Sequence, residues 1–262
     1  MTAVPIRKEY RNLAPKDVLP RFLLFKKASG LSQRTVDDYQ LILGIFFSRF
    51  PDALDYPRER TMEFLSAYEN PTSYNIRFAY LKVFWDWTAR EGYFRGDRHP
   101  LDGLKKRKPR GRIVQLEEAE VHNLLDQPDK GRYAGFRDYA LICLQVDTGI
   151  RPGEALQLMP DDFHPEKGEV IVRAEVAKTR TPRILPLAAP TIQTIETLLS
   201  LHCPTWRNAP IFATEYGLPF SVREYSRRVK DYGKRCGLDI TAYSLRHAAA
   251  LLLLRKGADA FT

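Results

Sequence analysis

Three basic residues, far apart in the sequence, occupy positions from which they could bind one anion together. Arg151 follows a glycine turn in TGIRPGEAL and precedes Pro152, a residue that favours the first turn of a helix. Lys178 stands where a strand is expected to enter a turn in EVAKTRTPRILPL, and Arg246 opens the apolar helix of YSLRHAAALLLL. A guanidinium beside the free N–H groups of a helix start is a good phosphate ligand. Because each residue alone would be an ordinary surface charge, the predicted phosphate site depends on all three.

The composition favours an anionic partner without identifying it. The 262 residues carry a formal net charge of +9 and are 44% hydrophobic, enough for one large domain or two of ordinary size. The three cysteines form no C-x-x-C pair and the five histidines are scattered, so neither a disulfide framework nor a metal site is expected. No signal peptide or membrane span is recognisable, which predicts a cytoplasmic protein.

Residues 1–95 predict a small all-α domain. One helix is expected to begin near Pro15, and a second to have Ser32 as its N-cap. Two more are expected over residues 58–68 and from residue 71 to about Gly92. Four aromatic side chains of the last helix are expected to pack in the core of this domain: Tyr80, Phe84, Trp85 and Trp87.

Residues 96–112 predict a basic linker, because they combine glycines and prolines with a dense run of positive charge. Six basic residues in this run have no acidic residue among them: Lys105, Lys106, Arg107, Lys108, Arg110 and Arg112. Two interpretations stay open at this point. The segment either lies along a phosphate backbone or is a solvated hinge between two folded parts.

Residues 113–262 predict a second, mostly helical domain with a small sheet. LEEAEVHNLLDQ has the pattern of an amphipathic helix, and a buried helix is expected to end at Gly149. The segment GEVIVRAEVAKTRTPRILPL is typical of a strand, a second strand, a turn and a third strand. The predicted fold class is therefore mainly α with a small β-sheet, an all-α domain followed by an α+β domain.

With these segments in place, the sequence resembles the tyrosine recombinase family, the phage-integrase type of site-specific recombinase, over nearly its whole length. DTGIRPGEALQL is similar to the family's first arginine box, with Glu154 in the acidic position. AKTRTPRILPL is similar to the hairpin of the catalytic lysine, here Lys178, and YSLRHAAA to the second arginine box, with Arg246. The resemblance implies a core-binding domain over residues 1–95 and a catalytic domain over residues 113–262.

The resemblance also implies a reaction, in which a tyrosine hydroxyl attacks a DNA phosphodiester and forms a 3′-phosphotyrosine link. Arg151 and Arg246 would hold the non-bridging oxygens, and Lys178 would protonate the departing 5′-oxygen. Glu154 would orient its neighbours. No metal or nucleotide cofactor is implied, because the covalent link stores the bond energy. The implied partners are duplex DNA at inverted-repeat sites and further copies of the chain, from dimer to tetramer, associated with a bacterial nucleoid.

Two departures from the family pattern concern tyrosines. Tyr243 stands where the second box usually has histidine, and a phenol donates a hydrogen bond well but is a poor base at neutral pH. We predict that Tyr243 assists phosphate binding and is not the nucleophile. The family's nucleophilic tyrosine follows the second box, and no tyrosine follows Arg246 here. We therefore expect either a fragment of a longer recombinase or a DNA binder that does not cleave alone.

The helix expected in SVREYSRRVKDYGKRCG predicts a DNA-contacting face. Three basic residues share one face at spacings of four and three: Arg223, Arg227 and Lys230. Three apolar or aromatic residues favour another face: Tyr225, Val229 and Tyr232. The basic face is expected to contact DNA in the major groove. The alternative is an ordinary solvated face. Weaker candidates for DNA contact lie in the first domain: Arg34, Arg77 and Lys82.

Other functions remain open from the sequence. A DNA-binding regulator derived from the same fold would bind duplex DNA but form no covalent adduct. A helical protein or RNA scaffold with an incidental basic face would not depend on Arg151. A type IB topoisomerase shares the chemistry, but the compact integrase-like layout argues against it.

Overall fold

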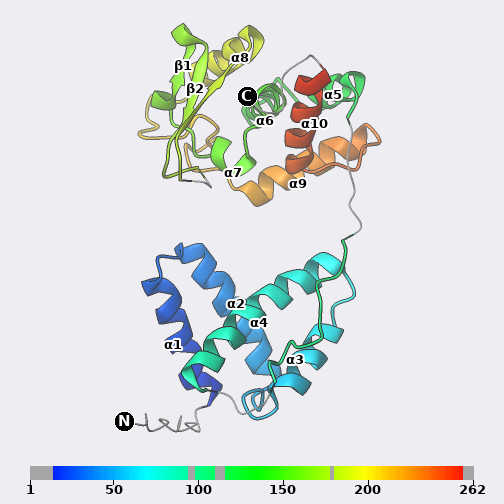
Figure 1. The fold of residues 1–262 in the computed structure, drawn as a ribbon. Helices are drawn as coiled ribbons and strands as arrows, with labels where there is room; N and C mark the ends of the chain where they lie inside the picture. The colour runs from blue at the N-terminus through cyan, green and yellow to red at the C-terminus, as the bar shows by residue number, and fades with distance from the viewer. Residues whose placement is uncertain (1–13, 94–97, 110–115, 178–179, 256–262) are drawn as a thin grey trace. The chain divides into compact units, whose positions relative to one another are not determined.

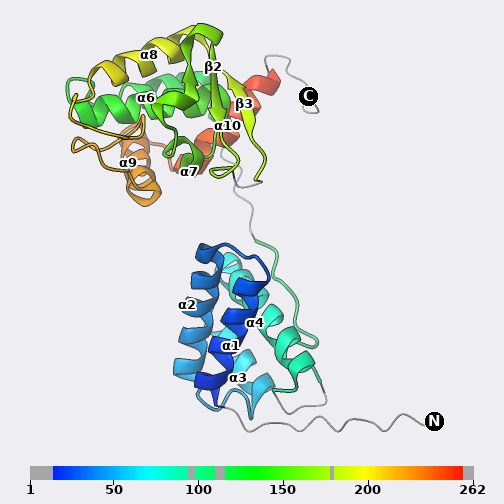
Figure 2. The ribbon, with the colours of Figure 1, turned by 90° about the vertical axis from the view of Figure 1, so that its left-hand side faces the viewer.

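The computed structural model describes residues 14–93, 98–109, 116–177 and 180–255, with side chains described as far as Leu251 in the last helix. The chain divides into two compact units, Met1–Arg112 and Ile113–Thr262. Figures 1 and 2 show the elements of both units.

The first unit is built from helices whose ends are set by local capping. They are α1 (Pro15–Ala28), α2 (Gln33–Arg49), α3 (Pro57–Ser66) and α4 (Pro71–Glu91). The Ser32 side chain accepts a hydrogen bond from the backbone N–H of Thr35 and so caps α2. Helix α4 ends where Gly92 adopts a left-handed conformation with φ of 72°. The predicted cap at Ser32 and the predicted end at Gly92 are both confirmed.

The core of the first unit is aromatic. Phe22 of α1 meets Phe84 of α4 edge to face, with ring centroids 5.2 Å apart, and both rings are fully buried. Trp85 is also fully buried and donates its indole N–H to the Thr61 hydroxyl over 2.9 Å. The predicted core position is confirmed for Phe84, Trp85 and Trp87, whereas Tyr80 is only half-buried.

Residues 98–109, the described part of the predicted basic linker, lie against the first unit. Leu101 is buried in its aromatic core. The Arg107 guanidinium stacks on the Tyr74 ring, 3.9 Å from its centroid, and donates to the Tyr68 carbonyl over 2.6 Å. Asn75 exchanges two hydrogen bonds with the backbone of Arg107. Three neighbouring lysines stay exposed: Lys105, Lys106 and Lys108.

The second unit combines helices with a three-stranded sheet, which confirms the predicted fold class. Its helices are α5 (Glu118–Leu125), α6 (Tyr133–Thr148), α7 (Pro152–Ala155), α8 (Ala189–Ser200), α9 (Val222–Arg235) and α10 (Ala242–Arg255), with 3₁₀ turns η1 (Pro160–Asp162) and η2 (Pro165–Lys167). Helix α6 is central and packs against α5, α7, α8 and α10 (Figures 1 and 2). Among the described helices, none is both long and apolar enough to cross a membrane.

The sheet differs from the predicted one in its strands. They are β1 (Phe163–His164), β2 (Glu169–Val172) and β3 (Arg183–Pro186), antiparallel in that order. The predicted strand after Val172 is wrong, because the N–H groups of Val176 and Ala177 turn back to the Arg173 carbonyl. The Arg173 side chain holds this turn through an ion pair of 2.9 Å with Asp162. The third strand of the sheet is β1, which comes before β2 in the sequence and pairs with its other edge.

A buried charge network fastens α9 to α6. The Asp138 carboxylate is fully buried and pairs with two guanidiniums, those of Arg137 and Arg228. It also accepts a hydrogen bond of 2.7 Å from the Tyr232 hydroxyl. Burial, together with the Asp138 charge, raises the pKa of Tyr232 to about 12, so the phenol keeps the proton that it donates. The Arg137 guanidinium also stacks on the Phe220 ring at 3.6 Å.

Removing the carboxylate of this network should destabilise the second unit strongly. In Asp138→Ala, Arg137 and Arg228 lose their buried counter-charge, and the free energy of unfolding is expected to fall by about 3–5 kcal/mol. A urea titration followed by circular dichroism measures it. The control is Asp129→Ala, which removes a solvent-exposed pair with Arg132 and should cost less than about 1 kcal/mol. Equal losses in the two variants would contradict the structural role of the network.

Candidate active site

The first arginine box is a tight turn between α6 and α7. Gly149 ends α6 with φ of 64°, and its N–H bonds to the Gln145 carbonyl over 2.9 Å. Ile150 is buried, and Arg151 then occupies the N-cap position of α7 with Pro152 in the first turn. The prediction that Arg151 follows a glycine turn and opens a helix is confirmed.

The Glu154 carboxylate joins two guanidiniums. It is only 3% exposed, and its Oε1 accepts from Arg151 Nη1 over 2.9 Å. Its Oε2 also accepts the backbone N–H of Arg151 over 3.3 Å. On the other side Arg183 binds it with both terminal nitrogens, Nη1 to Oε1 at 3.3 Å and Nη2 to Oε2 at 2.5 Å. The structure thus places Glu154 between Arg151 and Arg183.

Arg183 is not among the site residues predicted from the sequence. It is the first residue of β3 and pairs in register with Val172 of β2. One signal could have revealed it, because residues two apart on a strand face the same side. Arg183 and Leu185 therefore share a face, and both line the same pocket. Without knowledge of what that face covers, an arginine in a hairpin is indistinguishable from a solvated charge.

The second arginine box begins α10 with reciprocal capping. Thr241 N–H bonds to the Ser244 hydroxyl at 3.0 Å, and Ser244 N–H bonds to the Thr241 hydroxyl at 3.3 Å. One turn later, Arg246 Nη1 donates to the Gly149 carbonyl over 2.5 Å. Arg246 is therefore fixed against the turn that carries Arg151.

The electrostatic environment of Arg246 is dominated by burial and by like charges. Burial lowers the pKa of its guanidinium, and the positive charges of Arg151 and Arg183 lower it further. Glu154 acts in the opposite direction, as does Tyr243. Arg151 and Arg183 bind the one buried carboxylate, and Arg246 adds a third positive charge whose partner is the neutral Gly149 carbonyl. The excess positive charge suits an oxyanion.

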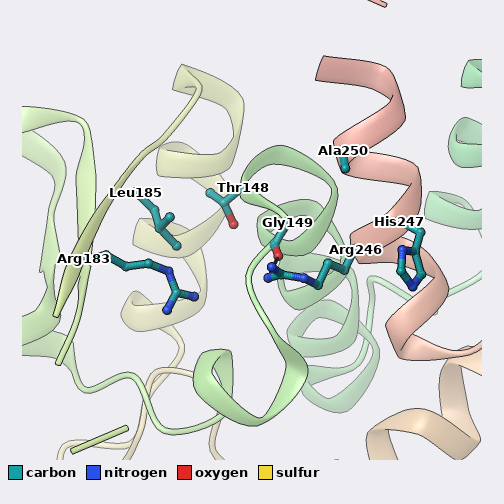
Figure 3. Close-up of a pocket in the computed structure, with 7 residues that line it drawn as sticks. All are labelled: Thr148, Gly149, Arg183, Leu185, Arg246, His247 and Ala250. Atoms are coloured by element: carbon teal, nitrogen blue, oxygen red, sulfur yellow. Dashed lines mark hydrogen bonds between the residues drawn. The ribbon is translucent and has the colours of Figure 1, made fainter. Parts of the chain in front are cut away.

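A pocket of about 430 Å³ opens beside these side chains. It is lined by Thr148, Gly149, Arg183, Leu185, Arg246, His247 and Ala250. Figure 3 shows Arg183 and Arg246 extending toward each other from β3 and α10, on opposite sides of Gly149. Within the described ranges, no group of three or more His, Cys, Asp or Glu side chains has an arrangement that would hold a metal ion.

The other predicted residues lie in α10, in α9, in the first unit and outside the described residues. Tyr243 is 52% exposed in the first turn of α10, and Lys178 lies outside the described residues. The predicted division of α9 into two faces is confirmed: Arg223, Arg227 and Lys230 are exposed, whereas Tyr225, Val229 and Tyr232 are buried. In the first unit Arg34 is exposed, and Arg77 is half-buried, stacking on the Tyr68 ring at 3.8 Å.

Comparisons with known proteins identify the family of the chain. The family model described as "Phage integrase family" matches residues 115–262. The chain is 27% identical to tyrosine recombinase XerD of Listeria innocua over 258 residues, covering 91% of this chain and 84% of the relative. It is 28% identical to tyrosine recombinase XerA of Pyrococcus horikoshii over 261 residues, covering 96% and 85%.

Among solved structures, the fold is similar to that of a lambda integrase tetramer bound to a Holliday junction. The TM-score is 0.77 at 18% identity, and the match covers 99% of this chain and 80% of that one. Fold, arginine boxes and relatives together define an enzyme class that breaks and rejoins DNA strands in site-specific recombination. The chain belongs to the phage integrase family of tyrosine recombinases.

Neutralising Glu154 should loosen the arginine cluster. Glu154→Gln keeps the shape of the side chain but removes the charge that holds Arg151 and Arg183, so the free energy of unfolding should fall by about 2 kcal/mol. Urea titration measures it. The control is Glu166→Gln, which changes an exposed carboxylate of the same unit and should leave stability unchanged. A Glu154→Gln protein as stable as the parent would contradict the role assigned to this carboxylate.

Proposed function

We propose that the second unit binds duplex DNA with one phosphodiester seated among Arg151, Arg183 and Arg246, and that this phosphate is the one attacked during recombination. The observation that carries the proposal is that Arg151, the N-cap of α7, and Arg183 of β3 bind one buried carboxylate. Arg183 and Arg246 of α10 line the pocket beside it. A phosphodiester supplies the negative charge that this cluster lacks.

Each residue has a separate role in this proposal. Arg151 and Arg246 hold the non-bridging oxygens and stabilise the charge that gathers on them in the transition state. Glu154 keeps Arg151 oriented through its side chain and its backbone N–H. Lys178 is assigned as the general acid that protonates the departing 5′-oxygen, on the family resemblance of AKTRTPRILPL alone. Tyr243, exposed one turn before Arg246, donates a hydrogen bond to the phosphate.

Contacts to the flanking duplex are proposed on both units. On the second unit they come from the exposed face of α9: Arg223, Arg227 and Lys230. On the first unit, which we take as the core-binding domain, they come from Arg34 and from the exposed lysines at 105, 106 and 108. Arg107 and Arg77 already stack on Tyr74 and Tyr68, so we assign them to shaping this surface, with a smaller share of phosphate contact.

The proposed DNA substrate is an inverted-repeat site bound by more than one copy of the chain. Support comes from the related folds: lambda integrase is known as a dimer bound to a core site and as a tetramer bound to a Holliday junction. A two-fold arrangement of half-sites matches the two-fold symmetry of a protein dimer. Association with the nucleoid follows from duplex binding.

Removing the two box arginines should weaken duplex binding and its salt dependence together. Arg151→Ala combined with Arg246→Ala should reduce affinity about tenfold and lower the slope of log K against log salt by about 1, because one phosphate contact is lost. Fluorescence anisotropy with a labelled duplex measures both.

The matched control for this loss is Lys167→Ala. Lys167 is an exposed lysine of the same unit and lies just before β2. Arg183 pairs with the residue at the other end of that strand, so Lys167 is a basic residue remote from the arginine cluster along β2. The change should leave affinity near the parent value. If the control and the double arginine variant bind equally well, the phosphate does not occupy the proposed pocket.

Tyr243→Phe separates the proposed binding role from a nucleophilic one. The variant should bind duplex about two- to threefold more weakly, because a single hydrogen bond is lost. It should form the same amount of covalent protein–DNA adduct as the parent, in a gel assay of the native protein with a nicked duplex. An adduct that the parent forms and Tyr243→Phe lacks would make Tyr243 the nucleophile.

A further inference from the structure

One buried amide side chain touches both arginine boxes. Gln145 is fully buried in the last turn of α6. Its Nε2 donates to the Ile150 carbonyl over 3.1 Å and to the Ala242 carbonyl over 3.3 Å. Ile150 directly precedes Arg151, and Ala242 lies one helical turn before Arg246. Both N–H groups of the amide are thus used to tie one box to the other.

The same side chain also reaches α9. The Tyr225 hydroxyl, fully buried, donates to Gln145 Oε1 over 2.6 Å. Tyr225 stands on the buried face of the helix whose opposite face carries Arg223, Arg227 and Lys230. Three elements therefore meet at one amide: the turn before α7, the start of α10 and the first turn of α9.

These contacts differ in kind from the packing around them. The surrounding core is apolar, with Leu141, Leu144 and Leu245 fully buried, and apolar contacts tolerate small sliding movements. Hydrogen bonds are directional, and a buried carbonyl that loses its partner is costly. Gln145 therefore restricts how α10 can shift or rotate relative to the turn that carries Arg151.

We propose that Gln145 is a positioning residue that sets the separation of Arg151 and Arg246. It thereby determines how tightly these two guanidiniums bind the phosphate. It does not touch the DNA. The inference rests on the proposed function, since it assumes that both arginines hold the same phosphate. Through Tyr225, the Gln145 amide also links the basic helix α9 to the position of these two arginines.

The test is a double-mutant comparison of duplex binding. Gln145→Met keeps length and volume but removes both donors and the acceptor, and it should weaken binding about tenfold. Introduced into the chain that already carries Arg151→Ala and Arg246→Ala, the same change should alter affinity by less than about twofold, because the groups that it positions are gone. Anisotropy with a fluorescein-labelled duplex of mixed sequence reports each affinity.

Two further variants separate positioning from general destabilisation. Tyr225→Phe removes only the hydroxyl that donates to Gln145 and should weaken duplex binding about two- to threefold. If Gln145→Met fails to fold, this variant tests the inference in its place. Leu124→Ala creates a cavity by truncating a fully buried side chain of α5. It lowers the unfolding midpoint by cavity formation and should leave duplex affinity unchanged.

The outcomes distinguish the inference from the proposed function. If the double arginine variant binds as tightly as the parent, both fail. If it binds weakly but Gln145→Met weakens binding by the same factor in both backgrounds, only the inference fails. The inference also fails if Leu124→Ala weakens binding as much as Gln145→Met at a matched loss of thermal stability.

Discussion

The site depends on holding like charges together. Two guanidiniums about 4 Å apart repel each other by about 4 kcal/mol at an effective dielectric constant of about 20, so a cluster of three requires a fixed counter-charge. Glu154 supplies it from a position that is almost completely buried, and it binds Arg151 and Arg183 at once. One carboxylate leaves the cluster positive, which is the condition for attracting a phosphodiester into it.

The neutral scaffold around this cluster is as important as the charges. Gly149 turns the chain between α6 and α7, and its carbonyl accepts the Arg246 guanidinium. Gln145, four residues earlier, bonds to the N–H of the same glycine through its backbone and to both arginine boxes through its side chain. The end of α6 thus determines where two arginines, 95 positions apart in the sequence, meet.

The features that could be predicted from the sequence are those with a local signal. The Ser32 cap, the Gly149 turn and the two faces of α9 each depend on a few adjacent residues, and the structure confirms them. Arg183, Gln145 and the turn after Val172 were missed because their partners are distant or belong to another element. The role of an arginine in a strand, or of a glutamine in a helix, depends on the residues that it faces after folding.

A crystal structure of this protein bound to duplex DNA would test the proposed phosphate site most directly. We expect one phosphate whose two non-bridging oxygens lie about 3 Å from the guanidiniums of Arg151 and Arg246, with Gln145 still bonded to Ile150 and Ala242. A complex in which the duplex contacts only α9 and the first unit, with no phosphate near either arginine, would contradict it.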